Sequence, residues 1–194
     1  GKLCARSGSH VYNLSLTASM IAAHGAGQTE SWAKGVANSL ARPPRGGDTD
    51  QITGVASGEC QIALANTYYY ARLARSAKPD EKAVADKVAV VLPNQGAKDR
   101  GTHVNISGAG VLKAAPNRDN AILFLEYLSS DSAQRYFTEG NNEWPAVPTT
   151  PVNNPALAAL GKFRHDTLLV MFGPGSSPLL YRSGVGKIAD SKQC

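Results

Sequence analysis

The run of three tyrosines at residues 68–70 is the feature of this sequence that points most clearly to chemistry. It follows Asn66-Thr67 and a short strand-like run, residues 60–65. Successive helical side chains point about 100° apart, so three adjacent rings cannot all face one core. The carboxyl end of a strand is also where open α/β sheets bind ligands. We therefore expect part of this cluster to face a binding cleft.

Phenol oxygens are suited to a hard, highly charged cation. The pKa of tyrosine is ordinarily about 10, so a neutral tyrosine is a poor ligand at pH 7. A bound cation of high charge stabilises the phenolate, and hard oxygen donors pair with hard cations. Clustered tyrosines without clustered cysteines favour Fe³⁺ over Zn²⁺ or Cu⁺. On spacing alone, aromatic packing at a surface is the commoner explanation of such a run.

Tyr12 is a second candidate ligand, because it lies just after the first strand-like run, residues 2–6. In a parallel sheet the carboxyl ends of neighbouring strands meet at one edge. Tyr12 and the pair Tyr68 and Tyr69 would then converge. Taken alone, Tyr12 is more simply an aromatic residue at a helix start.

The turn Ser7-Gly8-Ser9 offers hydroxyls and backbone N–H groups ahead of a helix, which is an anion site in principle. Arg6 beside it can add a bidentate contact. Turns of this kind are common, so the signal is weak.

Known catalytic motifs are missing from the sequence. The four histidines have no metalloprotease spacing, and there is no nucleophile elbow, P-loop lysine or dinucleotide-binding glycine pattern. Asp48, Asp50 and Glu59 allow a paired-carboxylate site, but a solvated helix start explains them better. We expect a protein that is not an enzyme.

Composition is that of an ordinary globular protein: 194 residues, 42% hydrophobic and 18% charged. No apolar run reaches the roughly 18 residues of a membrane span. The net charge is +5, but the basic residues are scattered, which argues against nucleic-acid binding. Of three cysteines, Cys4 and Cys60 lie in strand-like runs and are either a disulfide or two buried thiols; Cys194 is terminal.

The order of elements predicts an α/β fold with parallel strands. Strands are expected at residues 2–6, 60–65, 88–92 and 103–106. Helices are expected at 11–24, from about 29, from 48 or 49 to 58, from 67, from 79, from 117 or 119 as a strongly amphipathic helix, at 131–139 and at 155–160. The last 25 residues are ambiguous from their pattern.

Together these segments resemble the periplasmic ferric-ion-binding proteins of bacterial iron-uptake ABC transporters. The resemblance covers about residues 1–165 and fits less well after Phe172. It is carried by the segments 1–13 (GKLCARSGSHVYN), 58–60 (GEC), 66–70 (NTYYY), 101–110 (GTHVNISGAG) and 125–130 (LEYLSS).

The resemblance implies a class II periplasmic-binding-protein-like fold, a two-lobe clamp with Fe(III) in its cleft. Tyr12, Tyr68 and Tyr69 would supply phenolates. Arg6, Ser7 and Ser9 would help to hold a synergistic anion such as carbonate. The protein would be periplasmic and would meet the membrane only through an ABC permease, to which it delivers iron.

The resemblance also implies a lobe organisation. Residues 1–94 would form most of the carboxyl-terminal lobe, residues 95–145 would cross to the amino-terminal lobe, and residues 146–194 would return. Family members have roughly another hundred residues before this point, so we expect mostly one lobe, half a clamp. We also expect exposed apolar surface in the crossing segment, and weak iron binding or pairing with a second chain.

One alternative keeps the clamp and changes the ligand. A solute-binding protein for phosphate, a polyamine or an organic anion would use the tyrosines for stacking or hydrogen bonds. Colour on addition of iron separates the two hypotheses.

Overall fold

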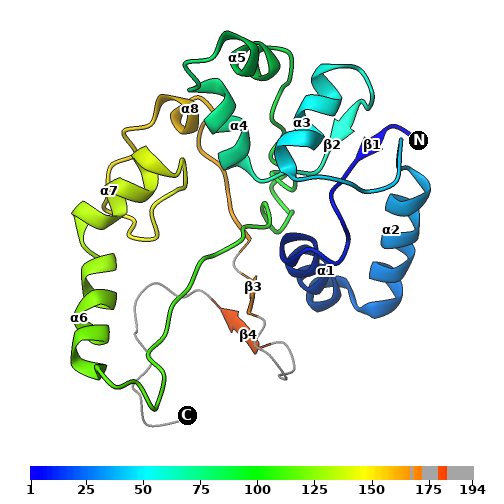
Figure 1. The fold of residues 1–194 in the computed structure, drawn as a ribbon. Coiled ribbons are helices and arrows are strands. Elements are labelled where there is room, and N and C mark those ends of the chain that lie inside the picture. The colour runs from blue at the N-terminus through cyan, green and yellow to red at the C-terminus, as the bar shows by residue number, and fades with distance from the viewer. Residues whose placement is uncertain (167, 172–178, 183–194) are drawn as a thin grey trace. The chain divides into compact units, whose positions relative to one another are not determined.

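The computed structural model describes residues 1–166, 168–171 and 179–182. Within these residues the helices are α1 (Val11–His24), α2 (Ala26–Asn38), α3 (Asp48–Ala56), α4 (Thr67–Ala74), α5 (Pro79–Asp86), α6 (Arg118–Leu128), α7 (Asp131–Gly140) and α8 (Pro155–Ala158). The strands are β1 (Leu3–Cys4), β2 (Ile62–Ala63), β3 (Leu168–Met171) and β4 (Leu179–Arg182). Figure 1 shows their course.

The chain divides into two compact units. Unit 1 comprises residues 1–10, 34–91 and 107–162, and unit 2 comprises residues 11–33, 92–106 and 163–194. These units do not correspond to the predicted segments 1–94, 95–145 and 146–194. Those segments refer to lobes of a longer receptor, so the lobe assignment stays a prediction.

The sheet of unit 1 is a parallel pair of short strands, as the sequence predicted. β1 pairs with β2 so that Leu3 lies opposite Ile62 and Cys4 opposite Ala63. A further parallel bridge joins Leu3 to Leu40. Cys4 is only 1% exposed, so the first strand runs through the interior of the unit. The carboxyl ends of β1 and β2 therefore point the same way, which sets the direction of the segments that follow them.

Helices α3, α4 and α5 pack together beside this pair (Figure 1). Ile52, Leu73 and Ala85 form the buried centre, one from each helix. Their starts obey local rules, because Asn66 precedes α4 with extended backbone and Pro79 opens α5 at a position where a missing N–H costs nothing.

A second small core in unit 1 joins α4 to α8 through Ala71, Ala156 and Leu157. Asn154, 1% exposed, organises it. Its side-chain oxygen accepts from the N–H groups of Ala156 and Leu157, and its amide donates to the carbonyl of Thr138 at 2.8 Å. One buried amide thus caps α8 and holds α7 against it.

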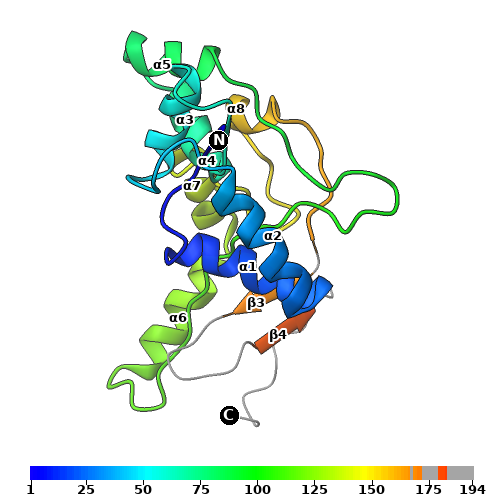
Figure 2. The same cartoon turned by 90° about the vertical axis from the view of Figure 1, so that its right-hand side faces the viewer.

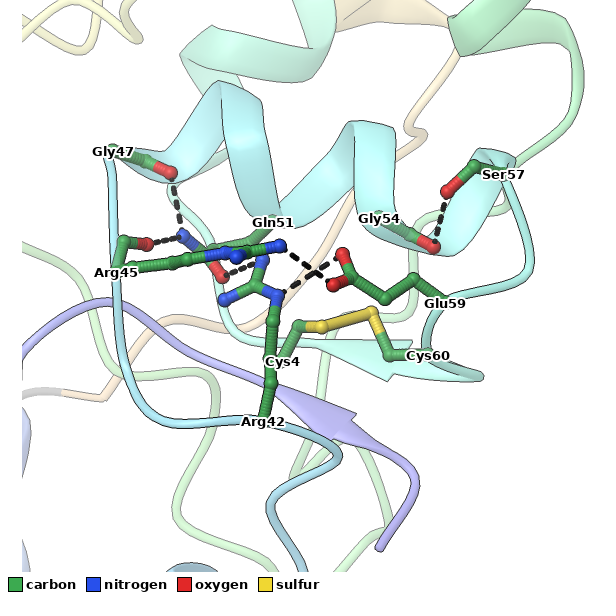
Figure 3. Close-up of a disulfide and its surroundings, with 9 residues drawn as sticks. All are labelled: Cys4, Arg42, Arg45, Gly47, Gln51, Gly54, Ser57, Glu59 and Cys60. Carbon is green, nitrogen blue, oxygen red and sulfur yellow. Dashed lines mark hydrogen bonds and ion pairs between the residues drawn. A yellow bond between two sulfur atoms is a disulfide. The ribbon is translucent and has the colours of Figure 1, made fainter.

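Cys4 and Cys60 form a disulfide, the alternative that the sequence left open. The bond joins β1 to the segment before β2 and lies under α3 (Figure 3). Glu59 beside it is paired with Arg42 at 3.0 Å and with Arg45 at 2.7 Å. The disulfide therefore ties the start of the chain to the part that leads into α4.

Unit 2 is built on α1 and the antiparallel pair β3 and β4, in which Leu168 lies opposite Arg182 (Figure 2). Within this unit Arg100 forms an ion pair with the buried Asp166, at 3.0 Å. Arg100 also donates to the carbonyl of Ser19 in α1. This arginine joins three segments of the unit that are far apart in sequence.

Two predicted strands were wrong. Residues 88–92 and 103–106 have no strand conformation, and Val91 is 81% exposed. A strand needs a hydrogen-bonded neighbour, and among the described residues neither segment pairs with a strand; the nearest bridge joins Thr102, just before the second segment, to His165. A run of β-branched residues indicates a preference for strand conformation, but it does not show that a neighbouring strand is available to pair with it.

The amphipathic helix expected after Asn117 forms as α6, but its apolar residues are not buried. α6 buries none of its residues. Leu123 is 62% exposed and Phe124 59% exposed. The expectation of exposed apolar surface within residues 95–145 is confirmed. No helix in the described ranges has the length and apolarity to span a bilayer.

The disulfide generates a stability prediction. It closes a sequence separation of 56 residues, for which the chain-entropy account gives a contribution of about 4 kcal/mol. Cys4→Ser with Cys60→Ser should lower the urea midpoint of unfolding by a corresponding amount. Cys194→Ser, which removes the third cysteine, is the control. Equal midpoints for all three proteins would show that the bond does not stabilise the fold.

His103 generates a prediction of pH dependence. Burial lowers its pKa below the ordinary value, and the charge of Arg100 acts in the same direction, although a hydrogen bond to Asn105 and the charge of Asp166 oppose them. The unfolded state therefore binds the proton first as pH falls, so stability should drop below about pH 6.5.

His103→Gln should flatten that part of a plot of urea midpoint against pH. The glutamine amide can keep the contact that Ser15 makes with the ring, at 3.1 Å. His24→Gln, at the exposed end of α1, is the control variant. A wild-type pH profile in His103→Gln would disprove the assignment.

Candidate metal centre

Tyr68 and Tyr69 form a stacked pair in the first turn of α4, which follows β2 by a short connection (Figure 1). Their ring centroids are 4.2 Å apart and the planes differ by 30°. Tyr69 and Tyr70 contact the core of Ile52, Leu73 and Ala85, whereas Tyr68 is not part of that contact. The helix predicted to start at Asn66-Thr67 is confirmed, and it carries the tyrosines as expected.

Two arginines interact with Tyr69. The guanidinium of Arg72 lies over its ring, 5.0 Å from the centroid, a cation–π geometry. Arg6 hydrogen-bonds the side chain of Tyr69. Burial alone would lower the pKa of Arg6, but the hydrogen bonds and charges of Asp48 and then of Tyr69 outweigh it, so the pKa is raised. Arg6 is a permanent cation beside this phenol.

The contribution of Asp48 to this site was not predicted from the sequence. It is 1% exposed, so its description as part of a solvated helix start was wrong. Oδ1 accepts from Nη1 of Arg6 at 2.9 Å, and Oδ2 accepts from the backbone N–H of Asn66 at 2.6 Å. No local pattern reveals these contacts, because their partners are 42 and 18 positions away.

The other two carboxylates considered with Asp48 are engaged separately. Asp50 accepts from the backbone N–H of Gly47, the N-cap of α3, at 2.7 Å. Glu59 is held by Arg42 and Arg45 (Figure 3). The three groups thus have different partners and do not form a carboxylate pair.

The predicted anion turn forms a small polar unit of its own. The hydroxyls of Ser7 and Ser9 are 2.8 Å apart, and the N–H of Ser9 donates to Oγ of Ser7 at 3.3 Å. Both serines are exposed. Arg6, the third member of the predicted set, is turned towards Asp48 and Tyr69. Anion binding by Arg6, Ser7 and Ser9 stays a prediction.

Tyr12 is the second residue of α1 and belongs to unit 2, whereas Tyr68 and Tyr69 belong to unit 1. Its predicted convergence with them stays a prediction.

The donor set suits a hard cation. Among the described residues no three histidine, cysteine or acidic side chains gather as a metal site. The stacked Tyr68 and Tyr69 carry phenol oxygens, a ligand type that suits a hard cation such as Fe³⁺.

Comparison with known proteins places the chain in a family. Residues 24–163 match the family model of bacterial extracellular solute-binding proteins. The chain belongs to this family.

Curated relatives of the chain carry names that refer to iron. It is 52% identical over 188 residues to iron uptake protein A2 of Synechocystis. The matched stretch is 95% of this chain and 54% of the relative. It is 37% identical over 97 residues to the major ferric iron-binding protein of Neisseria meningitidis serogroup B, covering 50% of this chain and 28% of the relative. The chain thus spans about half the length of iron uptake protein A2.

Solved structures agree with the fold. The chain is similar to apo FutA2 from Synechocystis, with 55% identity and a TM-score of 0.81 over 85% of this chain and 52% of that one. A Trichodesmium protein described as in complex with iron and citrate ligands gives 55% identity and a TM-score of 0.80, covering 85% and 51%. The ferric binding protein of Campylobacter jejuni gives 36% and 0.80, covering 85% and 51%. The fold is class II periplasmic-binding-protein-like, and the prediction of that fold class is confirmed.

Proposed function

We propose that this chain is the tyrosine-bearing part of a ferric-ion receptor, and that Tyr12, Tyr68 and Tyr69 are its iron ligands. The observation that carries the proposal is the stacked pair Tyr68 and Tyr69 in the first turn of α4, behind a parallel strand. Membership of a solute-binding family and the iron-related names of its relatives support it.

The chemistry follows from charge. Fe³⁺ replaces the phenolic protons, and each phenolate then cancels one unit of its charge. A synergistic anion such as carbonate would take up remaining charge, held by Arg6, Ser7 and Ser9. The relative described with iron and citrate supports the presence of an anion at such a centre.

Transport would follow from closure of the clamp. A ligand that binds the closed form better than the open form shifts the population towards it. The closed, iron-loaded receptor would then dock on an ABC permease from the periplasmic side. The family of extracellular solute-binding proteins supports this location and partner.

A ferric titration tests the proposal. Iron is supplied as a weak chelate and followed by visible absorbance, because Fe³⁺-bound tyrosinate gives a charge-transfer band that free tyrosine lacks. We expect a band that is lost or strongly reduced in Tyr68→Phe and in Tyr69→Phe, and weakened in Tyr12→Phe. The phenyl ring keeps the stacking, so loss of the band reports loss of the oxygen.

Tyr70→Phe is the matched control, since Tyr70 is the adjacent residue of the same helix and packs on the core. It should titrate like the wild-type chain. A chain that stays colourless with excess ferric chelate, or a band that survives Tyr68→Phe with Tyr69→Phe, would contradict the proposal. Binding of phosphate, a polyamine or an organic anion without colour would favour the non-metal clamp.

A further inference from the structure

Asp48 contacts both segments that determine where the tyrosine pair lies. It is the first residue of α3, and its side chain is 2% exposed. One carboxylate oxygen accepts from Arg6, which follows the carboxyl end of β1. The other accepts from the N–H of Asn66, just before α4. Both oxygens are thus used, and each reaches a different segment.

The contact with Asn66 acts on the backbone. Asn66 is the N-cap of α4, and its own side chain makes no capping hydrogen bond. Its N–H donates to Asp48 at 2.6 Å, a short bond of the kind that an ionised acceptor favours. Tyr68 and Tyr69 follow two and three residues later, so the direction of the first helical turn depends on this contact.

The contact with Arg6 acts on a side chain. Asp48 engages Nη1 of Arg6, and Arg6 also hydrogen-bonds Tyr69. A planar guanidinium fixed at one edge can present its remaining N–H groups in only a few directions. Asp48 therefore determines the orientation in which the Arg6 guanidinium contacts Tyr69.

The residue next to Asp48 holds the second arginine that contacts the Tyr69 ring. Thr49 accepts a hydrogen bond from Arg72 at 3.0 Å, and Arg72 lies over the ring of Tyr69. Two consecutive residues at the start of α3 thus anchor both arginines that contact Tyr69.

We infer that Asp48 is a positioning residue of the tyrosine centre: it does not touch the ligand but orients Tyr68 and Tyr69 through Asn66 and Arg6. The inference rests on the proposed function. Outer partners that orient metal ligands typically change metal affinity by about 10- to 100-fold when they are replaced.

The test compares Asp48→Asn with Asp50→Asn in the 194-residue chain. Both changes remove one negative charge at the start of α3, but the Asp50 carboxylate accepts from the N–H of Gly47, whereas the Asp48 carboxylate accepts from Arg6 and Asn66. We expect Asp48→Asn to bind ferric iron about 10- to 100-fold more weakly, with a shifted charge-transfer maximum. Asp50→Asn should keep the wild-type band. Wild-type affinity and band position in a folded Asp48→Asn would overturn the inference.

A second pair of variants decides the matter if Asp48→Asn does not fold. Asn66→Pro deletes the N–H that Asp48 accepts, at a φ of −77° that proline adopts without strain. Asn66→Ala removes the same side chain and keeps the N–H. Weaker iron binding or a shifted band in Asn66→Pro relative to Asn66→Ala would support the inference, and equal behaviour would overturn it.

An iron-free measurement separates this inference from the proposed function. The ring-proton NMR signals of Tyr68 and Tyr69, assigned with their phenylalanine variants, report the stacking of the two rings. They should move in Asp48→Asn and stay in place in Asp50→Asn. If the wild-type chain gives no iron band, the proposed function fails, and these signals alone decide whether Asp48 positions the pair. Unchanged signals in Asp48→Asn would then overturn it.

Discussion

The buried carboxylate of Asp48 is the constraint on which the ordering of the tyrosine segment depends. Removing a carboxylate from water is costly unless it is paired and its oxygens accept hydrogen bonds. Here Arg6 supplies the charge and Asn66 supplies an N–H. Breaking such a buried pair from one side typically costs about 3–5 kcal/mol, because the other charge is left without a partner. The carboxylate therefore ties the exit of β1 to the entry of α4 more firmly than the two-residue strands can do by themselves.

The sequence predicted what local rules govern. Several helix boundaries follow from local signals: Asn66 before α4, Pro79 at the start of α5, and glycines in turns. Helix α1 begins and ends where its pattern predicted. The parallel direction of β1 and β2 was also predictable, because helices separate the two strands. The helix boundaries depend on neighbours within a few residues and the strand direction on the order of the elements, and a single sequence contains both.

Features that depend on distant partners were not predictable. The apolar run at residues 88–92 satisfies every local rule for a strand, yet no neighbouring strand is present among the described residues. Asp48 is the opposite case. Its position at a helix start suggests a solvated carboxylate, but in the folded chain it is buried against Arg6. The tyrosine pair was found because an unusual residue type is visible in any context, whereas an aspartate at a helix start is common.

The disulfide between Cys4 and Cys60 also bears on how the protein is made. The parallel ladder that it spans has two residues in each strand, so hydrogen bonds alone hold these strands weakly while the chain assembles. Asp48, Arg42 and Glu59 all lie within the stretch of chain that the disulfide closes, between Cys4 and Cys60. If an oxidant acts early, the disulfide fixes the register of β1 against β2 before these ionic contacts form. In a reducing environment the ionic contacts alone would have to fix that register. The yield of correctly assembled protein should thus depend on the redox conditions of synthesis.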